Sequence, residues 1–128
     1  MRLMIASVLT GTLLLGLAGI PGSGQAQTTA PAAARPAAFA QCAGCHSTTP
    51  GKHLFGPSLA GISKRRSGTA AGYAYSPALA KAGIGWNAKT LDRWLTAPQK
   101  MVPGTRMPLS GVSNPADRRA LVAYLLTL

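Results

Sequence analysis

The chain has 128 residues, a length that accommodates one domain and excludes two of ordinary size. Thirteen Lys and Arg side chains face only two acidic ones, Asp92 and Asp117, and the formal net charge is +11. Because net charge governs association rather than fold, this excess predicts an anionic or acidic partner and leaves the fold class open.

The first 26 residues have the organisation of a secretory signal peptide. Arg2 supplies the positive start, residues 3–20 are uncharged and mostly apolar, and residues 24–26 (Gly-Gln-Ala) place small side chains at a cleavage site. The alternative is an uncleaved membrane anchor, which a stretch this short and rich in Ser, Thr and Gly disfavours. We therefore predict cleavage after Ala26, export to the periplasm of a Gram-negative bacterium, and no stable membrane insertion of the mature chain.

A flexible arm is predicted for residues 27–36, which are rich in Ala and Pro without apolar periodicity, and one domain for 37–128. About four short helices are expected there, because capping residues or prolines begin each segment and a glycine or proline follows several of them. They are expected from Pro36 into the cysteines, from Ser76 to Gly83, from Asn87 to Pro98, and from Asn114 to Leu126. Residues 47–72 contain many glycines and predict ordered loop, and no segment alternates with period two. The fold class is therefore all-α with long Gly/Pro-rich loops.

Large side chains for a core are scarce, since the chain has two Phe, two Trp and three Tyr. A domain must offset its conformational entropy by burying apolar surface. A large buried apolar cofactor would help to close that gap.

Residues 42–46 (Cys-Ala-Gly-Cys-His) match the C-x-x-C-H pattern of haem c attachment. On one helical turn the thiols of Cys42 and Cys45 share a face and can reach two vinyl groups of one porphyrin, while His46 brings a ring nitrogen to the iron. A disulfide between these cysteines closes too small a loop to stabilise much. Two alternatives stay open. A thioredoxin-like redox motif needs a βαβ setting, and a zinc site with His53 as the fourth ligand lacks a second well-spaced pair.

The second axial position of the iron needs a sulfur or nitrogen ligand from further along the chain. Met107 is favoured because Pro103, Gly104 and Pro108 make its loop stiff and tightly turned. Met101 is better explained as a gap-filling core side chain, and His53 as a histidine that bonds a loop carbonyl.

These residues and their spacing resemble class I cytochrome c, in the c2-like branch. Matching segments are FAQCAGCH (39–46), GKHLFGPSLAGI (51–62), RRSG (65–68), GYAYS (72–76), Trp86, LDRWLTAP (91–98), VPGTRM (102–107) and RRALVAYL (118–125). The resemblance implies the small cytochrome c fold around one covalent haem c, and an electron-transfer protein rather than an enzyme.

The resemblance also implies roles for individual residues. Cys42 and Cys45 would form the thioethers, His46 and Met107 would be the axial ligands, and the carbonyl of Pro57 would orient His46. The groups that would bond or neutralise the haem propionates are Arg65, Tyr75 and Trp86.

Three positions depart from the family pattern. Trp94 stands where a tyrosine is usual and Leu79 where an asparagine is usual, so two polar groups near the haem are absent. Ala34 replaces a glycine expected in the N-terminal helix, where it bears on close helix crossing.

Basic side chains on loops and helix ends are expected to meet acidic redox partners through small, salt-sensitive interfaces. These residues are Lys52, Lys64, Arg66, Lys81, Lys89, Lys100 and Arg106. Nucleic acid is not expected as a partner, because the chain has no motif of that class and is exported. We expect a monomeric one-electron carrier between respiratory or dehydrogenase partners; the alternative is a haem c subunit of a periplasmic oxidoreductase complex.

Overall fold

The computed structural model describes residues 33–128. The predicted signal peptide (1–26) and most of the predicted arm (27–36) lie outside the described residues. Residues 33–36 precede the first helical turn without regular structure. No helix within 33–128 has the length and apolar character that a membrane span requires.

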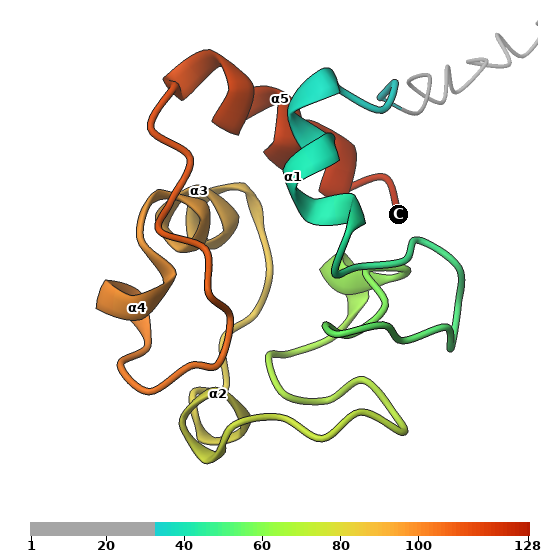
Figure 1. Ribbon diagram of the computed structural model, residues 1–128, viewed down its shortest axis with the longest axis vertical. Coiled ribbons are helices and arrows are strands. Elements are labelled where there is room, and N and C mark those ends of the chain that lie inside the picture. Colours follow the sequence, from blue (N-terminus) through green and yellow to red (C-terminus); the bar gives the residue numbers. More distant parts are fainter. Residues whose placement is uncertain (1–32) are drawn as a thin grey trace, which may run out of the picture.

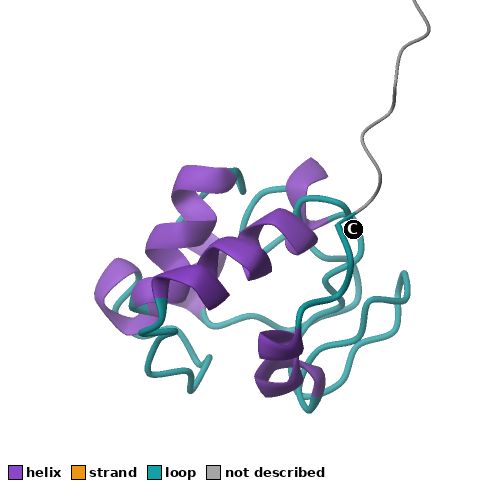
Figure 2. Ribbon diagram, turned by 90° about the horizontal axis from the view of Figure 1, so that it is seen from above, coloured by secondary structure: helices purple, strands orange, loops and turns teal. Residues whose placement is uncertain are grey.

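Short helices joined by long loops make up the described chain (Figures 1 and 2). In chain order they are the 3-10 turn η1 (Ala37–Phe39), α1 (Ala40–Ala43), the 3-10 turn η2 (Ile62–Lys64), α2 (Pro77–Lys81), α3 (Ala88–Thr96), α4 (Pro98–Met101) and α5 (Pro115–Leu125). Between residues 33 and 128 the β-structure is a single isolated bridge, Arg66 to Gly85, and no strand forms. The all-α prediction is confirmed.

Local capping explains where the predicted helices begin. The Ser76 hydroxyl accepts a hydrogen bond from the amide of Leu79 at α2, and Pro77 occupies the first helical position. At α3, Asn87 and Thr90 form a reciprocal capping box, with bonds of 3.0 and 2.9 Å. Asn114 caps α5 without such a reciprocal bond, its side chain accepting from the amide of Ala116 at 2.8 Å.

Pro98 has one structural role that was predicted and one that was not. It was expected to stop the helix that starts after Asn87, and α3 does end at Thr96, but Pro98 then begins the additional short helix α4. Proline lacks the amide hydrogen that a first-turn residue does not need, so one residue serves both as terminator and as first helical residue.

The core lies where η1 and α3 pack on α5 (Figure 1). Phe39 of η1 and Tyr124 of α5 meet edge to face with ring centroids 5.2 Å apart, and Leu91 and Leu121 are fully buried. Ala34, the departure expected to bear on close helix crossing, is exposed coil before η1 and lies in no helix. The contact between η1 and α5 includes the Phe39–Tyr124 pair instead.

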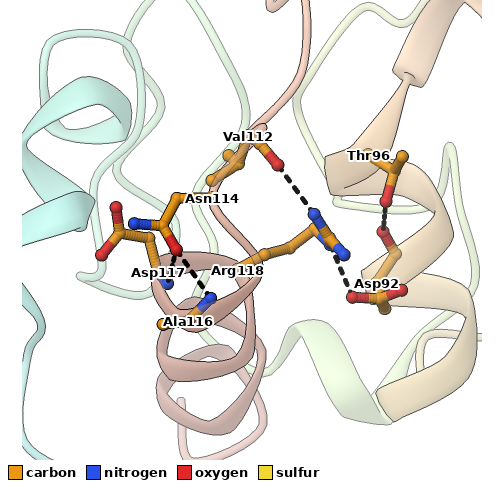
Figure 3. A network of polar contacts seen from close by, with 7 residues as sticks. All are labelled: Asp92, Thr96, Val112, Asn114, Ala116, Asp117 and Arg118. Atoms are coloured by element: carbon orange, nitrogen blue, oxygen red, sulfur yellow. Dashed lines mark hydrogen bonds and ion pairs between the residues drawn. The ribbon is translucent and has the colours of Figure 1, made fainter.

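One ion pair joins α3 to α5 (Figure 3). Arg118 donates from Nε to Asp92 Oδ1 at 2.7 Å and from Nη1 to the carbonyl of Val112 at 2.9 Å. The arginine side chain is only 16% exposed, so this contact is better shielded from water than an ordinary surface pair. Arg118 thereby fixes the loop that leads into α5.

Candidate functional site

Loops and helices from the whole described chain surround a cavity of about 540 Å³. Every residue predicted for the haem site lines it: Cys42, Cys45, His46, Pro57, Arg65, Tyr75, Trp86 and Met107. Large apolar side chains complete the wall, among them Leu59, Leu91 and Leu95. The two residues that depart from the family pattern, Leu79 and Trp94, line it as well, and Trp94 packs edge to face on Trp86 with centroids 5.5 Å apart.

The two cysteines, three residues apart, belong to one helical turn. The amides of Cys45 and His46 both donate to the carbonyl of Cys42, at 3.0 and 2.9 Å, so α1 runs directly into the histidine. Both thiols are free, and burial raises the pKa of Cys42, with the neighbouring Cys45 adding to the effect. A catalytic redox thiol needs a lowered pKa, so this environment and the absence of a sheet from residues 33–128 count against the thioredoxin-like alternative.

The imidazole of His46 is held in one orientation. Its Nδ1 lies 2.7 Å from the carbonyl oxygen of Pro57, and because that oxygen can only accept, Nδ1 carries the proton. Burial lowers the pKa of His46, while the bond to Pro57 opposes the shift, so the neutral ring is favoured. A neutral ring with its proton on Nδ1 leaves the Nε2 lone pair available to a metal.

Gly56 lies flat against the same ring. A Cβ atom built on Gly56 would come within 2.7 Å of His46 Nδ1 and closer still to Cε1. The backbone there is fixed, since the Gly56 amide donates to the carbonyl of Cys45 at 2.8 Å. The close approach of backbone and imidazole therefore requires glycine at this position.

His53 has a different environment. Its Nε2 donates to the carbonyl of Ala71 at 2.8 Å, and its Nδ1 accepts from the amide of Ser58 at 3.0 Å. Both ring nitrogens thus brace two loops, as predicted for a structural histidine. Within residues 33–128, no three His, Cys, Asp or Glu side chains lie together as a metal site would require, and both nitrogens of His53, the fourth ligand of the zinc alternative, are already bonded to backbone.

The two candidate methionines are separated by the fold. Both pack against the hydrophobic core, but Met107 lines the cavity and Met101 does not. The backbone around Met107 is tied by the amide of Gln99, which donates to the carbonyls of Thr105 and Met107, each at 2.9 Å. Sequence reasoning missed Gln99, because its partners are brought to it only by the folded loop.

Polar side chains also line the cavity, among them Arg65, Tyr75 and Thr105. The Arg65 guanidinium donates to the carbonyls of Ala60 (2.9 Å) and Ser58 and is thereby fixed in place. Burial raises the pKa of Tyr75, with a hydrogen bond to the Ala70 backbone and then the cation of Arg65 opposing the shift, so the phenol keeps its proton as a donor. Thr105 Oγ1 is buried without a hydrogen-bond partner among the described residues.

An orphaned buried hydroxyl is costly unless a ligand oxygen satisfies it. Thr105 was also missed by sequence reasoning; the signal was its place in VPGTRM, two residues before Met107. An apolar cavity wall with a fixed guanidinium, a phenol and an unpartnered hydroxyl suits a ligand that combines a large apolar ring with carboxylates. Haem has that composition, so the residues present fit it.

The basic residues predicted for docking are all exposed. Two of them also form hydrogen bonds to backbone carbonyls. Arg66 donates from Nε to the carbonyl of Gly83 at 3.1 Å, and Arg106 donates from Nη2 to the carbonyl of Ala74 at 2.8 Å. Arg106 also lines the cavity.

Comparison with known proteins gives consistent matches over nearly all of the described chain. The Cytochrome c family model matches residues 32–128. Cytochrome c2 iso-2 of Magnetospirillum fulvum is 45% identical over 93 residues, which cover 73% of this chain and 97% of that protein. Cytochrome c2 of Rhodoblastus acidophilus is 48% identical over 88 residues, covering 68% and 82%. Among solved structures, cytochrome cH from Methylobacterium extorquens matches with a TM-score of 0.66 and 42% identity, covering 71% of this chain and 92% of that one.

Proposed function

This chain belongs to the cytochrome c family, and from that premise we propose that it carries single electrons between periplasmic partner proteins, with His46 and Met107 as axial ligands of a haem joined to Cys42 and Cys45. The family consists of electron-transfer proteins rather than enzymes and carries one covalently attached haem c. The observation that supports this assignment most directly is one cavity lined by both cysteines, His46 and Met107.

When bound, the haem supplies a reversible one-electron iron couple. The chain's own residues set its surroundings. The Pro57 carbonyl keeps the His46 proton on Nδ1 and so presents Nε2 as the ligand. The Met107 thioether would be the second protein ligand of the iron, which would leave no site open for oxygen or another substrate. Arg65, Tyr75 and Trp86, together with Thr105, are proposed to hold the carboxylates, with the apolar wall excluding water from the ring.

The test of the site is the visible spectrum of holoprotein made with a haem c maturation system. The haem is expected to stay with the chain after denaturation, and the ferric form to show a sulfur-to-iron band. That band is expected to vanish in Met107→Ala and to survive in the matched variant Met101→Ala. A band lost in Met101→Ala but kept in Met107→Ala would refute the ligand assignment, and titratable thiols in native protein would refute haem attachment.

Docking is proposed to use the exposed basic residues against an acidic partner surface. Only two acidic residues oppose thirteen basic ones, so the electrostatic field of the molecule attracts an acidic surface. Dissolved salt screens this attraction and shortens its range. Electron-transfer rates with an acidic redox protein are expected to fall steeply from low to physiological ionic strength. Lys81→Gln is expected to slow the bimolecular rate more than Arg119→Gln, which makes the same charge change at an exposed position of α5 outside the proposed docking set. Salt-independent rates would contradict electrostatic docking.

Residues 1–26 are proposed to direct export and to be removed as the chain is exported. N-terminal sequencing of the protein from a periplasmic fraction is expected to begin at Gln27. A protein that keeps residues 1–26 and stays with the membrane fraction would instead support the anchor alternative.

A further inference from the structure

The segment that carries Met107 contains no helix. The chain has no regular structure between the end of α4 and the start of α5, so the placement of the thioether depends on a small number of specific contacts. One is a turn within the segment, where the amide of Thr105 donates to the carbonyl of Val102 at 3.1 Å. Another is the bond from Arg106 Nη2 to the carbonyl of Ala74 at 2.8 Å.

Gln99 supplies the contacts nearest to the sulfur-bearing residue. Its Nε2 donates to the carbonyl of Thr105 and to the carbonyl of Met107 itself, both at 2.9 Å. Gln99 stands in the first turn of α4, directly after the fully buried Pro98, so its backbone is anchored in the core. One amide group therefore links a fixed helix to the backbone on both sides of Arg106.

We propose that Gln99 is the positioning residue for the distal ligand. Its two bonds hold the loop in the closed arrangement in which Met107 can reach the iron, and they reduce the fraction of molecules in which the loop has moved away. The inference rests on the proposed function, because it takes Met107 as the ligand. Gln99 does not touch the iron and acts only through the backbone of residues 105–107.

A competing ligand measures the open fraction. Imidazole can bind ferric iron only when Met107 has left, so its apparent dissociation constant rises as the open fraction falls. The closed loop of the wild type is expected to make imidazole binding weak. A variant that changes the open fraction of the loop therefore changes this dissociation constant by the same factor. The constant is measured from the loss of the sulfur-to-iron band as imidazole is added.

The main variant is Gln99→Glu, which keeps the length and shape of the side chain and removes both N–H donors. Two hydrogen bonds of ordinary net strength correspond to an effect of about tenfold, so imidazole is expected to bind about tenfold more tightly to Gln99→Glu. Gln99→Arg restores donors with a group that stays protonated and does not ligate iron, and is expected to remain within about threefold of wild type. Gln99→Ala replaces the Glu variant if that protein does not accumulate.

Thr127→Val is the matched control. It keeps the side-chain shape and removes one hydroxyl bond to a backbone carbonyl, that of Tyr124 at 2.7 Å, in the C-terminal turn. Imidazole binding is expected to be unchanged. Urea unfolding of each variant separates loop release from general loss of stability.

The outcomes distinguish the two claims. A wild type that shows the sulfur-to-iron band, with imidazole affinity the same in Gln99→Glu as in Thr127→Val, would overturn the role of Gln99 and leave the proposed function standing. The role of Gln99 would also be overturned if Gln99→Glu and Thr127→Val lost the same unfolding free energy and neither changed its imidazole affinity. A wild type without the band would instead remove Met107 as ligand, and the role of Gln99 with it.

Discussion

Replacing Gly56 with alanine is expected to push the His46 imidazole out of its position. The added Cβ would lie 2.7 Å from Nδ1 and 2.9 Å from Nε2, distances that real Cβ atoms do not show. The glycine cannot retreat easily, because its amide donates to the carbonyl of Cys45 at 2.8 Å and its own carbonyl accepts from the amide of Leu54 at 3.0 Å. The ring must therefore move.

Two costs add up when it does. Forcing one extra carbon into a packed site costs about 1–3 kcal/mol. A displaced ring also loses its bond from Nδ1 to the Pro57 carbonyl, for about 1 kcal/mol. The free energy of unfolding is expected to fall by about 2–4 kcal/mol. At about 4–8 °C for each kcal/mol in a domain of this size, the melting temperature drops by roughly 10–30 °C.

Thermal unfolding of the holoprotein, followed by far-UV circular dichroism, measures this change. Gly85→Ala is the matched control, since a Cβ there meets no atom within 4 Å and its backbone is not in the left-handed region. The control is expected to change stability by less than about 1 kcal/mol. Equal melting temperatures for Gly56→Ala and Gly85→Ala would refute the steric reasoning.

Two further predictions concern the ion pair and the cofactor. Arg118→Ala removes bonds to the Asp92 carboxylate and the Val112 carbonyl, so urea unfolding is expected to show a loss of about 1–3 kcal/mol, against almost none for the exposed Arg119→Ala; equal losses would contradict it. Removal of haem leaves a cavity of about 540 Å³ that few core side chains can close. A Cys42→Ala/Cys45→Ala chain made without haem is expected to lose most of its helical circular dichroism and its cooperative melting; a sharp melting transition would show that the chain folds unaided.

Much of the helical structure could be predicted because its signals are local. Asn87 and Asn114 cap the helices they were expected to cap, since an Asx side chain and the amides that it satisfies are neighbours in sequence. The short helix α4 was missed for a related reason. Pro98 has the same local signature whether it ends one helix or begins the next, and only the packed chain decides between them.

The residues of the site likewise fall into those with a local sequence signal and those without one. The pair Cys42 and Cys45 is prescribed by the spacing of two groups on one macrocycle, so a five-residue motif is enough to find it. Thr105 and Gln99 have no comparable signature. Their importance comes from a buried hydroxyl left without a partner and from carbonyls that approach a distant amide, both of which exist only after the loop has folded.

The contact between Phe39 and Tyr124 imposes an order of events on the making of this molecule. The turn that leads to the first cysteine packs on α5, the last helix of the described chain. That helix is synthesised after nearly all of the rest of the domain. Before α5 is present, Phe39 lacks the ring on which it packs. We therefore expect the turn that bears the two thiols to be more exposed in the unfinished chain than in the folded domain.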